Sequence, residues 1–216
     1  MNKRVYLLFH IVMLLLCIIM LFPVFYSVMI SFAPAKTGIL RIIPESFVFD
    51  HYIRLFDHGL FGRYIINSVI YAAGGALLSM VVSAMMAYAL ARMRFPGRNA
   101  MFGFMFVIMM LPQLTNMVPL YKIASDLKLL NTYGLMILIF GSFGVPLAVF
   151  ILKGFFESIP RVLEEAAFID GATPMQGFIH VVFPIASPGL FATLLINFVY
   201  SWNNFFTPLI MISKTK

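Results

Sequence analysis

Residues 5–32 read VYLLFHIVMLLLCIIMLFPVFYSVMISF, and this stretch contains no Asp, Glu, Lys or Arg. A helix of about 20 apolar residues, rising about 1.5 Å per residue, crosses the hydrocarbon core of a bilayer. Inside lipid every backbone amide needs an internal partner, and a helix supplies one within its own segment. Four further runs lack these charged residues and are long enough to cross, namely 64–91, 99–121, 129–152 and 181–213.

The composition of the whole chain excludes a soluble domain. Apolar types make up 62% of the 216 residues and charged types 11%, against roughly 45–50% and roughly 25% in soluble domains. At this size a soluble domain has too much surface for its volume to bury so much apolar area. The net charge of +7 is scattered between the runs, so contact with anionic lipid headgroups explains it more simply than nucleic acid.

The predicted fold is therefore an all-α, polytopic membrane helical bundle with five transmembrane helices. A β-barrel would instead show alternating segments of about ten residues. The first run exceeds the core of a signal peptide, about 7–15 residues, which favours a retained helix. A short interfacial helix is expected near 52–56 and an amphipathic one within 121–132. The five expected spans are about 8–31, 66–90, 100–119, 133–152 and 186–207.

The connection at 153–184 predicts two short helices outside the bilayer. Pro160 suits the first turn of the first helix, and Ser158 is expected to cap it. Gly171 allows that helix to end in a left-handed conformation. The second helix is expected over 174–184.

Thr173 is expected to cap this second helix, which would end near Pro184. In the first helix, Ala166 and Ala167 form a small patch that another backbone could approach closely. The plain alternative for this first helix is a solvated linker.

Several residues of this connection stand at fixed spacing. In order they are Glu165, Ala166, Ala167, Gly171, Val181, Phe183 and Pro184. This pattern resembles the EAA loop of binding-protein-dependent permeases of ATP-binding-cassette (ABC) importers, with Val181 and Phe183 in place of the usual Ile and Leu. Further segments are similar to the sugar-transporting, MalG-type branch, among them AYALAR at 87–92, FPGR at 95–98, IDGA at 169–172 and WN at 202–203.

The resemblance implies a type I ABC importer permease whose coupling loop, 153–184, lies in the cytoplasm. Its docking residues would be Glu165, Ala166, Ala167 and Gly171, closed by Pro184. Glu165 would pair with a basic group of the ATPase subunit, the alanines would permit close approach, and Gly171 would reverse the chain. The N-terminus would then lie in the cytoplasm. The Arg92–Arg98 cluster also favours this orientation, although the overall count of basic residues on the two sides does not decide.

The resemblance also implies the partners and the location. The chain would import a mono- or oligosaccharide across the bacterial inner membrane as a multi-pass protein. Its partners would be a second permease subunit, two ATPase subunits, an extracytoplasmic solute-binding protein and membrane lipid, without nucleic acid. ATP would be used by the ATPase, and this chain would bind no cofactor and carry no catalytic or metal-binding residue.

Residues 1–216 are expected to form one transmembrane permease domain. The family normally has a sixth span, and five spans with an end at Lys216 lead us to expect a truncated product. A non-functional truncated permease is therefore one alternative, and a permease for another small solute, such as a polyamine or a peptide, is a second.

Polar residues within the last span suggest a substrate path. Sugars are held by amide hydrogen bonds and aromatic stacking, which Asn197, Trp202 and Asn203 could supply. The alternative is structural, because amides also bridge helices and tryptophan also anchors interfaces.

Two other functional classes fit the sequence less well. A secondary transporter usually has a buried carboxylate, whereas all eight acidic residues lie outside the expected spans. A membrane enzyme would need converging titratable residues, and the sequence has no phosphate-binding Gly-rich loop ending in Lys-Ser/Thr. We therefore do not expect an enzyme.

Overall fold

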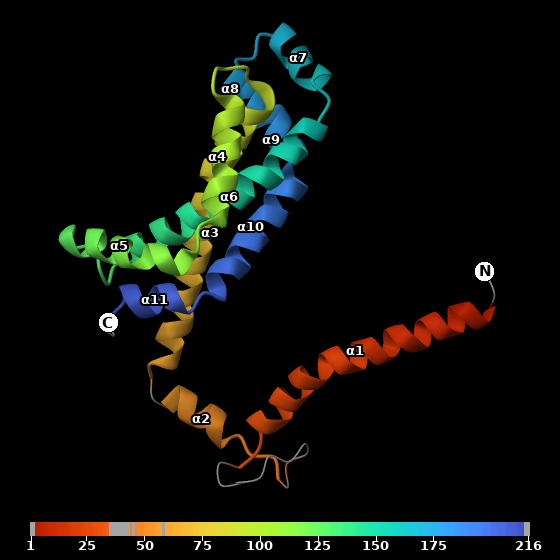
Figure 1. Cartoon of the computed structure of the whole chain (residues 1–216), viewed down its shortest axis with the longest axis vertical. Coiled ribbons are helices and arrows are strands. Elements are labelled where there is room, and N and C mark those ends of the chain that lie inside the picture. The colour runs from red at the N-terminus through yellow and green to blue at the C-terminus, as the bar shows by residue number, and fades with distance from the viewer. Residues whose placement is uncertain (1–2, 35–43, 45, 58, 214–216) are drawn as a thin grey trace. The chain divides into compact units, whose positions relative to one another are not determined.

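The computed structural model describes residues 3–34, 44, 46–57 and 59–213, and in these residues it contains helices and no strand. This confirms the predicted all-α class. The helices are α1 (Lys3–Ser31), α2 (Asp50–Asp57), α3 (Phe61–Arg92), α4 (Arg98–Met110), α5 (Gln113–Asp126), α6 (Tyr133–Ser158), α7 (Val162–Ile169), α8 (Pro174–Gly177), the π-helical turn η1 (Phe178–Val182), α9 (Phe183–Ile185), α10 (Ser187–Trp202) and α11 (Phe206–Met211) (Figure 1).

The chain divides into two compact units, 1–65 and 66–216. In the first, α1 is long and apolar enough to cross a membrane from Val5 to Ser31, and it contains the predicted span 8–31. Helix α2 confirms the short helix expected near 52–56. The Ser31 and Tyr52 hydroxyls lie 2.7 Å apart, and the rings of Phe32 and Tyr52 lie 5.4 Å apart. These contacts join α2 to the end of α1.

The second unit is built on α3, α6 and α10, and glycines allow these helices to approach closely. A Cβ at Gly75 would lie 2.6 Å from Phe140 Cβ of α6, and one at Gly189 of α10 would lie 2.5 Å from the Phe155 ring. Close packing through small residues is the usual basis of helix association in membranes. Figure 1 shows α7 and α8 at one end of this unit, and α5 and α11 at the other.

The span expected over 100–119 is broken in the structure, and that prediction of one continuous helix is wrong. Helix α4 ends at Met110, α5 begins at Gln113, and the two meet at 96°. Leu111 adopts an extended conformation (φ −72°, ψ 125°). The cause is Pro112, which disfavours helical geometry in the residue before it and has no N–H to continue the helix.

Helix α5 continues to Asp126, so the separate amphipathic helix expected within 121–132 is also wrong. The chain leaves α5 through a turn in which Lys128 and Asn131 have positive φ values of 56° and 63°. Thr132 then caps α6 by accepting a hydrogen bond from the Leu135 N–H at 3.3 Å.

The span expected over 186–207 is shorter than predicted, because α10 ends at Trp202. Asn204 Oδ1 accepts a hydrogen bond from the Thr207 N–H at 3.1 Å, which favours the start of a new helix, α11. Before α10, the segment 174–185 meets it at 77°. Among the described residues, α1, α3 and α6 are long and apolar enough to cross a membrane alone, and each of the two bent pairs is a further candidate.

Candidate functional site

Helix α7 begins later than the sequence predicts. It starts at Val162 instead of Pro160, and Ser158 is not its cap. The Ser158 hydroxyl donates instead to the Phe155 carbonyl of α6 at 2.7 Å, a local bond that serine often makes within a helix. The extended conformation of Ile159, favoured before proline, separates α6 from α7.

The turn after α7 has the predicted form. Gly171 has a φ of +89°, in the left-handed region. The Ala172 N–H donates to the Ala167 carbonyl at 2.9 Å, and the Gly171 N–H to the Phe168 carbonyl at 3.1 Å. These bonds satisfy carbonyls at the end of α7 and turn the chain back.

Thr173 caps the next helix, as predicted. Its hydroxyl accepts from the Gln176 N–H at 3.3 Å, while the Gln176 side chain accepts from the Thr173 N–H at 2.8 Å, which makes a capping box. Pro184 lies in the first turn of α9 and does not end the segment, which continues to Ile185. The prediction that this segment ends near Pro184 is therefore confirmed to within one residue.

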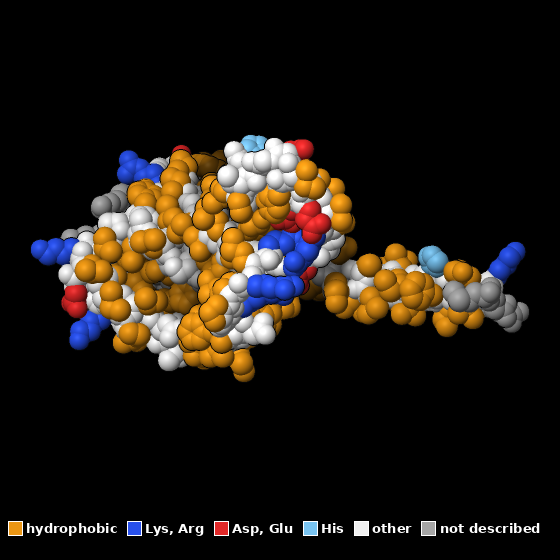
Figure 2. All heavy atoms as spheres, turned by 90° about the horizontal axis from the view of Figure 1, so that it is seen from above, with side chains coloured by type: hydrophobic (Ala, Val, Ile, Leu, Met, Phe, Trp, Pro, Cys, Tyr) orange, Lys and Arg blue, Asp and Glu red, His pale blue; other side chains and the backbone are white. Residues whose placement is uncertain are grey.

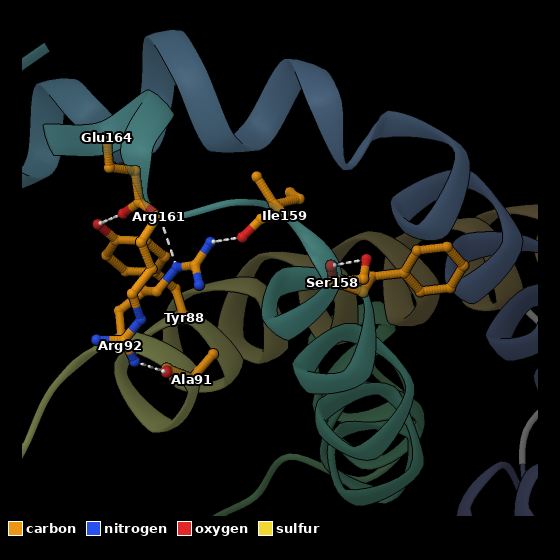
Figure 3. A network of polar contacts seen from close by, with 8 residues as sticks. Tyr88, Ala91, Arg92, Ser158, Ile159, Arg161 and Glu164 are labelled. Atoms are coloured by element: carbon orange, nitrogen blue, oxygen red, sulfur yellow. Dashed lines mark hydrogen bonds and ion pairs between the residues drawn. The ribbon is translucent and has the colours of Figure 1, made fainter. Parts of the chain in front are cut away.

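A buried ion pair fastens α7 to the end of α3 (Figure 3). Arg92 Nε lies 2.6 Å from Glu164 Oε1, and the two side chains are 8% and 6% exposed. The Nε–H does not point at this oxygen, so the contact is an ion pair without a hydrogen bond. The Tyr88 hydroxyl donates to Glu164 Oε2 at 2.8 Å. A buried carboxylate is tolerated only with such partners.

Two arginines extend this network to the backbone. Arg92 Nη2 donates to the Ile159 carbonyl at 2.8 Å, and Arg161 Nη2 donates to the Ala91 carbonyl at 3.4 Å. Arg92 at the end of α3 therefore bonds to the segment before α7, and Arg161 in that segment bonds to the end of α3. The Phe178 ring packs on the Tyr88 ring at 4.6 Å between centroids, which adds apolar contact beneath the ion pair.

The opposite face of α7 is exposed. We call Val162, Glu165, Ala166 and Ile169 the coupling surface. Val162 is 69% and Ile169 is 86% exposed, while Glu165 and Ala166 are also exposed and Ala167 is half-buried. Figure 2 looks onto this end and shows charged side chains gathered in a hollow framed by hydrophobic ones. A cavity of about 260 Å³ there is lined in part by Arg92, Arg161, Glu164 and Glu165.

Residues 79–216, which include this loop, match the family described as the inner-membrane component of binding-protein-dependent transport systems. The chain belongs to this family. The trehalose transport system permease protein SugB of Mycobacterium tuberculosis is 37% identical over 187 residues, 85% of this chain and 68% of that protein. The diacetylchitobiose uptake system permease protein NgcG of Streptomyces coelicolor is 34% identical over 92% of this chain and 67% of that protein.

The chain thus spans about two thirds of the length of these relatives. Its fold is also that of a solved structure, a bacterial ABC transporter involved in the import of the acidic polysaccharide alginate. The TM-score is 0.83 and the identity 24%, covering 98% of this chain and 76% of that one. The protein is accordingly a multi-pass inner-membrane transport component, as the sequence predicts.

In this transport component the three residues of the predicted substrate path are not brought together. Asn197 is 3% exposed, and its Nδ2 donates to Ser79 Oγ of α3 at 3.1 Å across Gly144 of α6. This contact matches the alternative in which the amide bridges helices. Trp202 is 45% exposed and stacks on Phe198, whereas Asn203 is exposed beyond the end of α10.

Sequence reasoning missed Glu164 as the internal partner of the loop. It singled out the neighbouring Glu165, whose side chain the structure leaves exposed. One signal was available, because Tyr88 and Arg92 are four residues apart and share a helix face. A hydroxyl and a guanidinium on one face at the end of an apolar helix indicate a buried acidic partner.

Proposed function

We propose that this chain is one permease subunit of an ABC importer for carbohydrate, and that the coupling surface docks on a separate ATPase subunit. One observation carries this proposal, namely that α7 is fixed on one face by the Arg92–Glu164 pair and exposes Val162 and Ile169 on the other. Exposed apolar side chains rimmed by charge are typical of protein interfaces. Glu165 would pair with a basic group on the ATPase, and Ala166 would allow close approach.

The remaining assignments follow from docking on a cytoplasmic ATPase. The loop 153–184 and the N-terminus would lie in the cytoplasm, and α5 and α11 would lie toward the outside. A second permease would complete the pathway, a second ATPase would dock on it, and a solute-binding protein would deliver the substrate. Carbohydrate is supported by relatives whose names specify trehalose, diacetylchitobiose and arabinooligosaccharides.

Cross-linking tests the docking. Cys17 is the only cysteine, so Cys17→Ser gives a background without thiols. Ala166→Cys in this background, co-expressed with the ATPase and the second permease of its transporter, should cross-link to a cysteine introduced in the ATPase surface groove. Leu209 is 59% exposed on α11, so Leu209→Cys is the matched control. This variant should not cross-link to the ATPase. Equal cross-linking of both variants, or of neither, would contradict the proposal.

A further inference from the structure

A cavity lined by both amide and apolar side chains lies at the end of α10 that is remote from the coupling surface. Its volume is about 210 Å³. The 16 residues of α10 place it about 24 Å from the start of that helix. In the proposed topology this is the outer side, where substrate arrives. The lining residues are Gln113, Leu114, Met117, Asn203, Asn204, Phe205, Phe206 and Thr207.

Hydrogen bonds hold two amides of this cavity in fixed orientations. Gln113 Oε1 accepts from the Tyr200 hydroxyl at 2.7 Å and from Asn204 Nδ2 at 3.2 Å. Gln113 Nε2 donates to Thr207 Oγ1 at 3.2 Å. An amide nitrogen carries two N–H donors. One donor on Gln113 and one on Asn204 therefore stay available, in positions set before any ligand arrives.

Asn203 differs from these two amides. It is exposed, and the structure records no hydrogen bond for its side-chain amide among the described residues. It can thus both donate to and accept from a ligand. Asn203 also takes no part in the hydrogen bonds that join α5 to α10 and α11. Its substitution therefore leaves those bonds in place.

The chemistry of the lining selects the class of ligand. None of the eight lining residues is charged. A phosphate or carboxylate group would call for Arg or Lys, and a polyamine would call for a carboxylate. Phe205 and Phe206 are 66% and 53% exposed, with ring centroids 5.7 Å apart. Their rings offer apolar faces beside the amides, the pairing that suits a sugar ring with hydroxyls at its rim and C–H groups on its faces.

We propose that this cavity contacts a single ring unit of a neutral carbohydrate, with Asn203 as a direct hydrogen-bonding residue. Pockets that hold whole drug-sized ligands measure roughly 300–1,000 Å³, so a cavity of about 210 Å³ fits one ring. The inference rests on the proposed function and narrows its substrate to uncharged sugars. The uncharged lining favours a neutral ring over a phosphate, an acidic sugar or a polyamine at this cavity.

The experiment uses the complete transporter, assembled from this chain, the second permease, the ATPase and the solute-binding protein in proteoliposomes that contain ATP. The neutral labelled probes are trehalose, diacetylchitobiose and an arabinose oligosaccharide, and the charged ones are sn-glycerol-3-phosphate and putrescine. Asn203→Ala should lower the initial rate of neutral-sugar uptake about tenfold, the effect of losing one or two hydrogen bonds. Asn116→Ala, in α5 but outside the cavity lining, should not change the rate.

Thiol protection tests contact directly. In the Cys17→Ser background, Leu114→Cys places a thiol in the lining and Leu209→Cys places one on α11 outside it. The transported neutral sugar should slow maleimide labelling at position 114 and not at 209. The site would be overturned if only the charged probes were taken up. It would also be overturned if the sugar did not slow maleimide labelling at position 114, or if Asn203→Ala and Asn116→Ala took up neutral sugar at equal rates.

Failure of the proposed function would look different from failure of the site. Uptake that persists without ATP or without the ATPase subunit would contradict the importer assignment, whatever Asn203→Ala does. Neutral-sugar uptake could instead depend on ATP while Asn203→Ala leaves the rate unchanged and the sugar does not protect Leu114→Cys. That result would keep the importer assignment and contradict only the proposed sugar contact at the cavity.

Discussion

Arg92 and Glu164 lie 72 positions apart in the sequence, yet their charged groups approach to 2.6 Å where both side chains are less than a tenth exposed. The pair joins the last turn of α3 to the first turn of α7. Because the Arg92 guanidinium also bonds to the carbonyl of Ile159, the residue that caps the end of α6, side-chain contacts join α3 both to α7 and to the end of α6. Under the proposed function, a force applied at the coupling surface would reach the bundle through these side chains as well as through the backbone.

Glu164→Ala should strongly destabilise the protein, because it leaves the Arg92 guanidinium buried without its partner. Breaking such a pair costs about 3–5 kcal/mol, and thermal unfolding of the detergent-purified complex measures the loss. Glu165→Ala, one position along on the exposed face, should leave the melting temperature nearly unchanged. Equal melting temperatures for the two variants would show that Glu164 does not stabilise the protein through this ion pair.

Tyr88→Phe should have a smaller effect of the same sign. It removes the hydroxyl that donates to Glu164 Oε2 and keeps the ring that packs on Phe178, so a loss of about 1–2 kcal/mol is expected. A double-mutant cycle of Tyr88→Phe with Glu164→Gln measures the coupling between them. Additive losses would show that the hydroxyl and the carboxylate do not interact.

Substitutions at Gly171 should impair transport through the backbone. A Cβ there meets no atom within 4 Å, so the φ of +89° is the obstacle. We expect Gly171→Asn to retain more uptake than Gly171→Val, since asparagine tolerates left-handed geometry. Gly171→Pro should abolish uptake while membrane insertion persists, because proline fixes φ near −65°. Normal uptake by the proline variant would remove the turn from the coupling mechanism.

Gly144→Ala should loosen the crossing of α3, α6 and α10. Its Cβ would lie 2.7 Å from both Asn197 Oδ1 and Ser79 Oγ, so the buried hydrogen bond that Asn197 Nδ2 donates to Ser79 Oγ must shift. Overpacking of this kind costs about 1–3 kcal/mol. Gly103→Ala in α4, where a Cβ meets no atom within 4 Å, is the matched control and should be neutral or stabilising. Equal melting temperatures for the two variants would contradict this packing.

The sequence predicts the helices that need no tertiary information. Long charge-free runs are sufficient for α1, α3 and α6, and local chemistry is sufficient for the left-handed Gly171 and the Thr173 cap. The break at Leu111–Pro112 is harder, because Pro23, Pro119 and Pro146 lie inside helices that continue. Whether a proline bends or breaks a helix depends on the surrounding packing.

The ion pair is hard to predict for a related reason. Glu164 and Glu165 are adjacent, have the same chemistry and differ by about 100° in direction on the helix. Only the packing of α7 against Tyr88 and Arg92 decides which carboxylate is buried. The same holds for Asn197, whose amide suits either a sugar or a helix contact until Ser79 is placed beside it.

The π-helical turn at Phe178–Val182 has a consequence for alignment and engineering of this loop. Such a turn holds one residue more than the α-helix it interrupts. Deleting one residue between Gly177 and Phe183 would let the segment close into a regular α-helix. Because the π-helical turn uses one extra residue for about the same rotation, the loss would leave the preceding Thr173 cap in nearly the same direction. A single-residue gap here is therefore compatible with a folded helix that still presents the exposed side chains of α7 in nearly the same direction.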